Sequence, residues 1–113
     1  MPYINLTTAV SIPDTLAVSL KERLADAITL IRGKSEEWLM INLNGDAKMY
    51  FKGLDTPSAM LEIAIFGSAS DGEYRALTAE CCSIAGELLG ISPDRVYVKY
   101  TEHDRWGWNG INF

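Results

Sequence analysis

An internal repetition constrains the fold more than any other feature of this chain. Each half has the order strand, long amphipathic helix, glycine, polar turn and strand. When Gly33 is aligned with Gly90, Ser35 falls on Ser92, and the apolar residues that follow each serine also coincide. A repeat of this kind is a supersecondary unit that completes its hydrophobic core by packing against its copy. The 113 residues are therefore predicted to form one domain with two βαβ repeats.

The first repeat, about residues 1–55, begins with the alternating pattern of a half-buried strand. A stripe of apolar residues at helical spacing follows, and Gly33 is expected to end this helix as a left-handed residue. The predicted elements are a strand at residues 3–10, a helix capped by Asp14 and ending before Gly33, a strand at residues 38–43 and a short hairpin strand at residues 48–51.

The second repeat, about residues 56–113, has a clearer helix start. Ser70 and Glu73 have the spacing of a capping box, and Gly90 is expected to close the helix. The predicted elements are a strand at residues 59–66, this helix, a strand at residues 95–100 and an unusually aromatic tail at residues 106–113.

Two βαβ units predict an α+β fold with a four-stranded mixed sheet. Right-handed crossovers place both helices on one face of that sheet. The opposite face is expected to carry apolar side chains with no helix left to cover it. An uncovered apolar face of this size predicts that other subunits cover it, so an oligomer is expected.

Composition argues against several classes of function. The formal net charge of −5 disfavours binding to a nucleic-acid backbone. Cys81 and Cys82 are adjacent and His103 is the only histidine, so neither a disulfide nor a metal site has support. No apolar run of 18 residues and no secretory signal pattern is present. The expectation is a cytoplasmic protein with no nucleic-acid, membrane, metal or cofactor partner.

Met1-Pro2 is the motif with the most direct chemical meaning. Removal of Met1 would leave Pro2 as a free secondary amine at the start of a strand, and such an amine can act as a base. Taken alone, Pro2 also suits a strand beginning, where no ladder donor is needed. Lys34 taken alone is interpreted as a solvated cation near a helix C-terminus.

Six short motifs in order resemble the macrophage migration inhibitory factor family of the tautomerase superfamily. They are Met1-Pro2, Gly33-Lys34, Thr56-Pro57, Gly67, Ser92-Pro93-Asp94-Arg95-Val96-Tyr97 and Gly107-Trp108-Asn109. The resemblance runs through the whole chain. It implies a homotrimer whose sheets line a central barrel, with three active sites at the subunit boundaries. It also implies a cofactor-independent keto–enol tautomerase of phenylpyruvate-like aryl α-keto acids, extending to dopachrome-like compounds.

The resemblance assigns roles to individual residues. Pro2 becomes the catalytic acid/base, Lys34 holds the substrate carboxylate and lowers the pKa of the Pro2 amine, and the backbone N–H of Phe66 binds a substrate oxygen. Tyr97 is expected to come from the adjacent subunit. The aromatic walls of the pocket are expected from Trp38, Trp108 and Phe113.

Three departures from the family pattern bear on this expectation. Lys99 stands where relatives often have Asn, which adds a cation near the pocket, and Trp106 replaces a smaller residue at the mouth. The family's Cys-x-x-Cys falls here on Ser58 and Leu61, so thiol–protein oxidoreductase activity is rejected.

Two other functions remain open from the sequence. The first is a cytokine-like protein that acts by binding a host receptor, released from cells without a signal peptide. The second is another chemistry of the superfamily, such as dehalogenation or decarboxylation, which usually needs arginines at the site. The available candidates are Arg32, Arg95 and Arg105.

Overall fold

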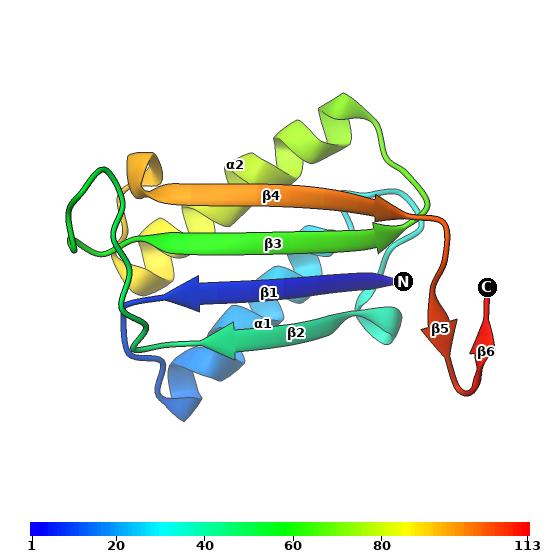
Figure 1. Cartoon of the computed structure of the whole chain (residues 1–113), viewed down its shortest axis with the longest axis horizontal. Helices are drawn as coiled ribbons and strands as arrows, with labels where there is room; N and C mark the ends of the chain where they lie inside the picture. Colours follow the sequence, from blue (N-terminus) through cyan, green and yellow to red (C-terminus); the bar gives the residue numbers. More distant parts are fainter.

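Four strands form one mixed sheet in the order β2-β1-β3-β4, and both long helices lie on the same face of it (Figure 1). The computed structural model describes residues 1–113. The elements are β1 (Pro2–Thr8), α1 (Asp14–Ile28), the 3₁₀ turn η1 (Glu36–Trp38), β2 (Met40–Asn44), β3 (Ala59–Phe66), α2 (Asp71–Leu89), the 3₁₀ turn η2 (Pro93–Arg95), β4 (Val96–His103), β5 (Gly107–Trp108) and β6 (Ile111–Asn112).

Strand pairing confirms the two βαβ units. β1 is parallel to β2 and β3 is parallel to β4, as a crossover helix requires, while β1 and β3 meet antiparallel at the centre. In that central pair Pro2 lies opposite Ile65 and Thr8 lies opposite Ala59. The start of β1 therefore lies in the middle of the sheet, at the end where β3 and β4 finish.

The core lies between the sheet and the helices. Ile4 and Leu6 of β1 are fully buried, and β3 alternates strictly between buried and half-buried residues, so one face of each strand is covered by α1 and α2. Helical residues complete the core; they are Leu20, Leu24, Ile28, Leu77, Cys81 and Ile84. The apolar stripes predicted for the two helices are confirmed.

The end of α1 differs from the prediction. The helix ends at Ile28, and the chain continues in tighter turns in which Leu30 N–H donates to Ala27 O at 3.0 Å and Ile31 N–H donates to Ile28 O at 3.1 Å. The Thr29 hydroxyl also donates to Asp26 O at 2.6 Å, which favours this tightening over a regular helix. Gly33 has a φ of +80°, so it turns the chain beyond the helix instead of capping it.

The segment between β2 and β3 also differs from the prediction. Trp38 belongs to η1, so β2 begins only at Met40. No strand forms at residues 48–51, and a single bridge joins Phe51 to Leu54. The hairpin prediction is wrong because Ala47 N–H donates to Thr8 O at 3.1 Å, at the end of β1, and so does not begin a ladder with β2.

The face opposite the helices is more polar than expected. Asn42 and Asn44 of β2 both donate to Asn5 Oδ1 of β1, at 3.1 and 2.8 Å, and Asn5 Nδ2 donates to Glu62 Oε2 of β3 at 3.2 Å. Lys99 Nζ of β4 lies 3.3 Å from Glu62 Oε1. We call this row the polar ladder. Apolar side chains flank it on the same face; they are Tyr3, Met40, Met60 and Tyr97.

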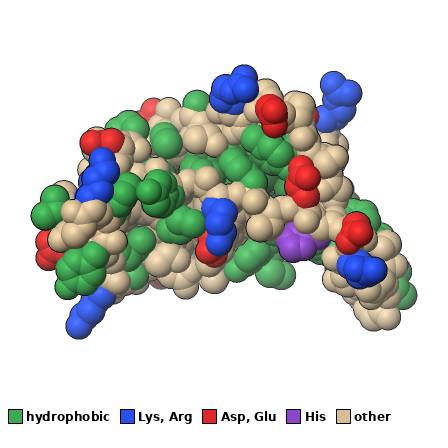
Figure 2. Space-filling view, turned by 45° about the horizontal axis from the view of Figure 1, so that its top comes forward, with side chains coloured by type: hydrophobic (Ala, Val, Ile, Leu, Met, Phe, Trp, Pro, Cys, Tyr) green, Lys and Arg blue, Asp and Glu red, His purple; other side chains and the backbone are tan.

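The aromatic tail forms a small hairpin that projects from the body as an arm (Figure 2). Trp108 pairs with Ile111, and both residues between them, Asn109 and Gly110, have positive φ. Two such residues make the type I′ turn that suits a tight hairpin, and Asn-Gly is its usual sequence. None of the helices is both long and apolar enough to cross a membrane.

Candidate active site

A pocket of about 650 Å³ opens between the start of β1, η1 and the C-terminal hairpin. Its lining is mostly apolar, as in many small-molecule sites. The lining residues are Met1, Pro2, Tyr3, Glu37, Trp38, Leu39, Met40, Trp106, Gly107 and Trp108. The pocket thus brings together four residues singled out from the sequence, Pro2, Trp38, Trp106 and Trp108.

Pro2 is buried at the first position of β1, where a residue without an N–H costs no ladder bond. While Met1 is present, the Pro2 nitrogen is part of a peptide bond and is neither basic nor protonated. The chemistry expected of Pro2 therefore depends on removal of Met1.

Met1 contacts the other polar groups predicted for the site. Its carbonyl oxygen accepts the Phe66 N–H at 3.0 Å, which extends the β1–β3 ladder by one bond. Burial is the main reason that the pKa of the Met1 amine falls from 8.0 to about 6, and the charge and hydrogen bonding of Lys34 lower it further. The Met1 amine is therefore largely unprotonated at neutral pH.

Lys34 is held beside the chain start by backbone geometry. Its amide donates to Ile31 O at 3.1 Å, and the positive φ of Gly33 turns the chain toward β3. The half-buried Nζ donates to Phe66 O at 2.8 Å and forms no ion pair with any carboxylate. An ammonium has three donors, so with Phe66 O and the Met1 amine as its partners it keeps one for an anion.

Aromatic rings form a continuous series from the pocket to β3. Trp38 and Trp108 meet edge to face with centroids 5.0 Å apart, Trp108 lies 6.2 Å from Phe113, and Phe113 lies 6.0 Å from Phe66. The Phe113 N–H donates to Trp106 O at 3.0 Å, which ties the chain end to the arm. The arm therefore brings Phe113 against Phe66 although 47 positions separate them in the sequence.

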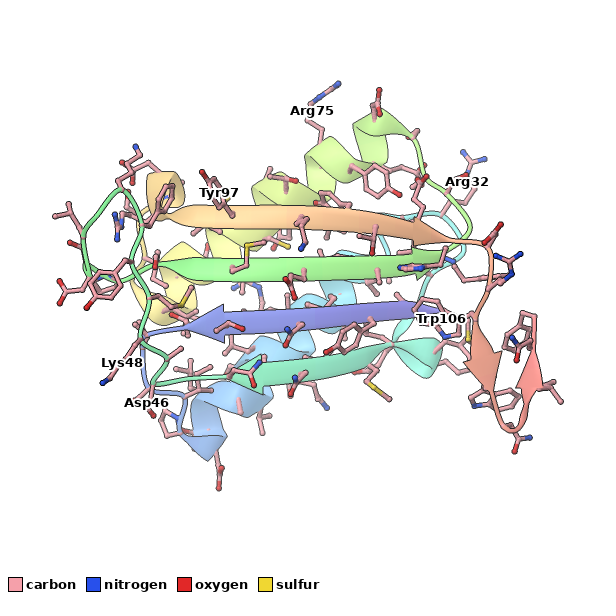
Figure 3. All side chains as sticks on the ribbon, viewed as in Figure 1. Arg32, Asp46, Lys48, Arg75, Tyr97 and Trp106 are labelled. Atoms are coloured by element: carbon pink, nitrogen blue, oxygen red, sulfur yellow. The ribbon has the colours of Figure 1, made fainter.

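Tyr97 and Lys99 do not reach Pro2 within one chain. Tyr97 lies opposite Met60, whereas Pro2 lies opposite Ile65, so the two are separated along the sheet. Figure 3 shows Tyr97 and Trp106 near opposite ends of β4. The Tyr97 ring packs against Phe51 at 4.7 Å, and Lys99 pairs with Glu62 in the polar ladder.

The three arginines considered for other chemistries lie away from the pocket. Arg95 is only 8% exposed and donates to the carbonyls of Phe51, Leu54, Thr56 and Pro57, at 2.6 to 3.4 Å. Arg32 points outward from the loop after α1 (Figure 3), and Arg105 is exposed beside Asp104. Within this chain no arginine lines the pocket.

Sequence reasoning missed several lining residues. Tyr3 and Met40 are cross-strand partners, and their place at the pocket follows only from the β1–β2 register. Glu37 lines the pocket from η1, the turn that also includes Trp38, the first residue of the predicted strand. The sequence assigns Met1 no role beyond its removal, yet Met1 lines the pocket and its carbonyl accepts the Phe66 N–H. The two cysteines take no part, and burial raises the pKa of the Cys81 thiol to about 12.

Comparison with known proteins gives a consistent relationship along the whole chain. The family model for macrophage migration inhibitory factor matches residues 1–113. The macrophage migration inhibitory factor of Meriones unguiculatus is 30% identical over 118 aligned positions, which cover 100% of this chain and 99% of that protein. The D-dopachrome decarboxylase of Bos taurus is 26% identical, covering 94% of this chain and 90% of that protein.

Solved structures of that family have the same fold as this chain. The crystal structure of Leishmania major MIF2 superposes with a TM-score of 0.93 and 25% sequence identity. The superposition covers 100% of this chain and 97% of that chain. The homologue from Prochlorococcus marinus has a TM-score of 0.79 and 27% identity, covering 98% of each chain.

Proposed function

The chain belongs to the macrophage migration inhibitory factor family, and from this premise we propose that it is a cofactor-independent keto–enol tautomerase. The proposed substrates are phenylpyruvate-like aryl α-keto acids. The relative named D-dopachrome decarboxylase supports dopachrome-like compounds as a second class to test. The proposed reaction moves one proton between the carbon next to the carbonyl and the carbonyl oxygen.

The proposed base is the Pro2 amine released when Met1 is removed. A base must be unprotonated at the working pH, and burial together with a nearby cation lowers the pKa of an amine. Both influences already act on the Met1 amine, whose pKa is about 6. Pro2 is buried and one residue further into the sheet, so its free amine experiences the same two influences. It would take the proton from carbon, and the Pro2 ammonium so formed would return that proton to the enolate oxygen; the reverse sequence would ketonise an enol.

One observation carries this proposal: Met1 interacts with both groups that would bind the substrate. Its amine is influenced by Lys34, and its carbonyl occupies the Phe66 N–H. Removal of Met1 would therefore create the base and, in the same step, release a backbone donor and leave room beside a cation. A keto acid offers a carboxylate to Lys34 and a carbonyl oxygen to the Phe66 N–H.

The aromatic residues support an aryl substrate. Trp38, Trp106 and Trp108 line the pocket, and Phe113 continues the aromatic series toward Phe66. Flat apolar walls with a few polar groups at one end match a molecule with an aromatic ring and a keto-acid end. No metal or cofactor is needed for such a proton transfer.

We propose that the working form is a homotrimer in which an adjacent subunit supplies Tyr97 and Lys99 to the Pro2 pocket. The separation of Tyr97 from Pro2 within one chain supports this arrangement, because a neighbour is then required to complete the site. Sedimentation would give the oligomeric state. Mixed refolding of Pro2→Gly and Tyr97→Ala subunits tests the sharing of residues: activity above that of either variant is expected, and no gain would contradict it.

The catalytic proposal is tested with enol phenylpyruvate and protein of defined N-terminus. Protein lacking Met1, checked by intact mass, should ketonise the enol, and Pro2→Gly should be slower by a factor of about 100 or more. Protein that retains Met1 should be inactive, because it has no Pro2 amine. Equal rates for Pro2→Gly and the parent, or full activity with Met1 retained, would refute the mechanism.

The names of the full-length relatives favour a second proposal, a cytokine-like role through a host receptor. For this role the protein would have to be released from the cytoplasm to the outside of the cell. Saturable binding to macrophages that persists in the Pro2→Gly variant would support it. Absence of saturable binding would contradict it.

A further inference from the structure

Glu73, in the first turn of α2, joins two segments that flank the candidate site. Its Oε1 accepts the Ser70 N–H at 2.9 Å, and the Ser70 hydroxyl accepts the Glu73 N–H at 3.1 Å, which completes a capping box. Its second oxygen, Oε2, accepts the N–H of Arg32 at 2.6 Å. That second bond has no role in capping α2, because Arg32 belongs to the other repeat.

The segment bound by Oε2 is the one that carries Lys34. Arg32 lies in the irregular turn after α1, two positions before Lys34, so its backbone has no helical hydrogen-bond ladder to fix it. The Arg32 side chain is exposed and points outward, so only its backbone meets Glu73 (Figure 3). Beyond this point the chain turns at Gly33 and places the Lys34 ammonium on Phe66 O.

The segment bound by Oε1 is the one that follows Phe66. After β3 the chain leaves through Gly67, whose N–H donates to His103 O at 2.8 Å. The Ala69 N–H donates to Glu102 at 3.3 Å, and the Ser70 N–H donates to Glu73. One carboxylate therefore holds the residues just before Lys34 and the residues just after Phe66 at a set separation.

We propose that Glu73 is a positioning residue for the tautomerase site: by bridging Ser70 and Arg32 it sets where the Lys34 ammonium stands relative to the Phe66 amide and the Pro2 amine. This inference rests on the proposed function. Glu73 does not line the pocket and touches no group assigned to the substrate. Its action is through the backbone of Arg32.

Electrostatics make this bridge persistent. The two backbone donors and the Ser70 hydroxyl interaction lower the pKa of Glu73 to about 2, with the Arg32 N–H as the largest cause. The carboxylate is therefore charged throughout the neutral and mildly acidic range. An ionised acceptor binds backbone donors more strongly than a neutral one. Protonation as pH falls through the lowered pKa would weaken the bridge.

The test compares Glu73→Ala with Ser70→Ala in protein lacking Met1. Both substitutions damage the capping box and should lower Tm by several degrees. Only Glu73→Ala removes the bond to Arg32. It should raise KM for phenylpyruvate about tenfold with kcat within about twofold, because misplacement of a binding group costs substrate affinity. Ser70→Ala should leave KM within about twofold of the parent. Equal KM changes in the two variants would overturn the proposal.

A second measurement does not depend on catalysis. Amide hydrogen exchange at Arg32 and Lys34 should be faster in Glu73→Ala than in Ser70→Ala, and unchanged protection would overturn the proposal even if KM rises. If the parent protein fails to ketonise phenylpyruvate, the proposed function fails while this exchange test still decides the positioning role. If Glu73→Ala does not fold, Glu73→Gln keeps one acceptor oxygen and should give smaller changes in the same direction. A Gln variant identical to the parent in both measurements would likewise overturn it.

Discussion

The two βαβ repeats have the same order of secondary-structure elements, but residues at equivalent positions differ in burial and in the groups they contact. After α1 the chain reads Gly33-Lys34-Ser35, and after α2 it reads Gly90-Ile91-Ser92. Lys34 is half-buried beside the start of β1 with no carboxylate partner, whereas Ile91 is 2% exposed and belongs to the core. A single position in the repeat thus holds a free cation in one half and an apolar core residue in the other.

The next equivalent pair shows the same division. Trp38 and Arg95 each end a 3₁₀ turn that leads into a strand. Trp38 is 42% exposed and lines the pocket, while Arg95 is 8% exposed and binds four backbone carbonyls. At these two equivalent positions the first repeat therefore places residues at the candidate site, whereas the second places one in the core and one on the loop at the far end of the sheet.

Removal of the buried cation should give the largest loss of stability. Arg95→Met leaves four carbonyls without their donor and should lower the free energy of unfolding by about 3 kcal/mol. Arg75→Met is the control, because Arg75 points into solvent from α2 (Figure 3) and should change stability by less than about 0.5 kcal/mol. Urea unfolding measures both. Similar losses in the free energy of unfolding for the two variants would contradict the stabilising role assigned to Arg95.

The equivalent test in the first repeat should affect activity and leave stability nearly unchanged. Lys34→Met removes the proposed carboxylate partner and should lower kcat/KM for phenylpyruvate about 30-fold, or ~2 kcal/mol. Lys21→Met, at an exposed position of α1, should have no measurable effect on kcat/KM. If Lys34→Met unfolds at a lower urea concentration but keeps the kcat/KM of the parent, Lys34 stabilises the fold and does not bind substrate. Lys34 and Ile91 would then not differ in the way proposed.

The influence of Lys34 on the chain start is measurable without any substrate. In protein that retains Met1, the pKa of the α-amine is about 6, lowered first by burial and then by Lys34. Lys34→Met should raise that pKa toward 8.0 without reaching it, since burial remains. NMR titration of the ¹³C-methylated amine gives both values. An unchanged pKa would show that the Lys34 charge does not act on this position.

The smallest expected effect on stability concerns the polar ladder. Lys99 and Glu62 are both well exposed, so Lys99→Gln should change the free energy of unfolding by less than about 1 kcal/mol. A clear change in KM despite this small effect would support delivery of Lys99 to a neighbouring subunit's pocket. An unchanged KM would indicate that Lys99 contributes only to the polar ladder and not to a neighbouring subunit's pocket.

The elements that sequence predicted well have strong local signals. The limits of β3 follow from an apolar run bounded by Pro57 and Gly67, and the start of α2 follows from Ser70 and Glu73. The end of α1 was missed because Thr29 hydrogen-bonds locally and tightens the last turn. The false strand at residues 48–51 has strand-like residues, but the Ala47 N–H just before it donates to Thr8 O and the Phe51 N–H donates to Leu54 O, so no ladder with β2 forms.

The open face shows why side-chain polarity is hard to predict from one strand at a time. Its Asn and Glu residues were visible in the sequence, yet the polar ladder exists only because the strand register places Asn5 beside Asn42, Asn44 and Glu62. Apolar side chains do lie on this uncovered face, as expected, but the polar ladder crosses its centre. The oligomer therefore remains a prediction carried by the family and by the position of Tyr97.

The sequence by itself determined the two repeats, their helical stripes and the residues that could do chemistry, because these depend on periodicity and on side-chain type. Only the tertiary structure decided which of those residues meet. The antiparallel β1–β3 register puts the Met1 carbonyl on the Phe66 N–H, and the irregular turn after α1 brings Lys34 to Phe66 O. These are contacts between residues more than 30 positions apart, and no local pattern encodes the distance between them.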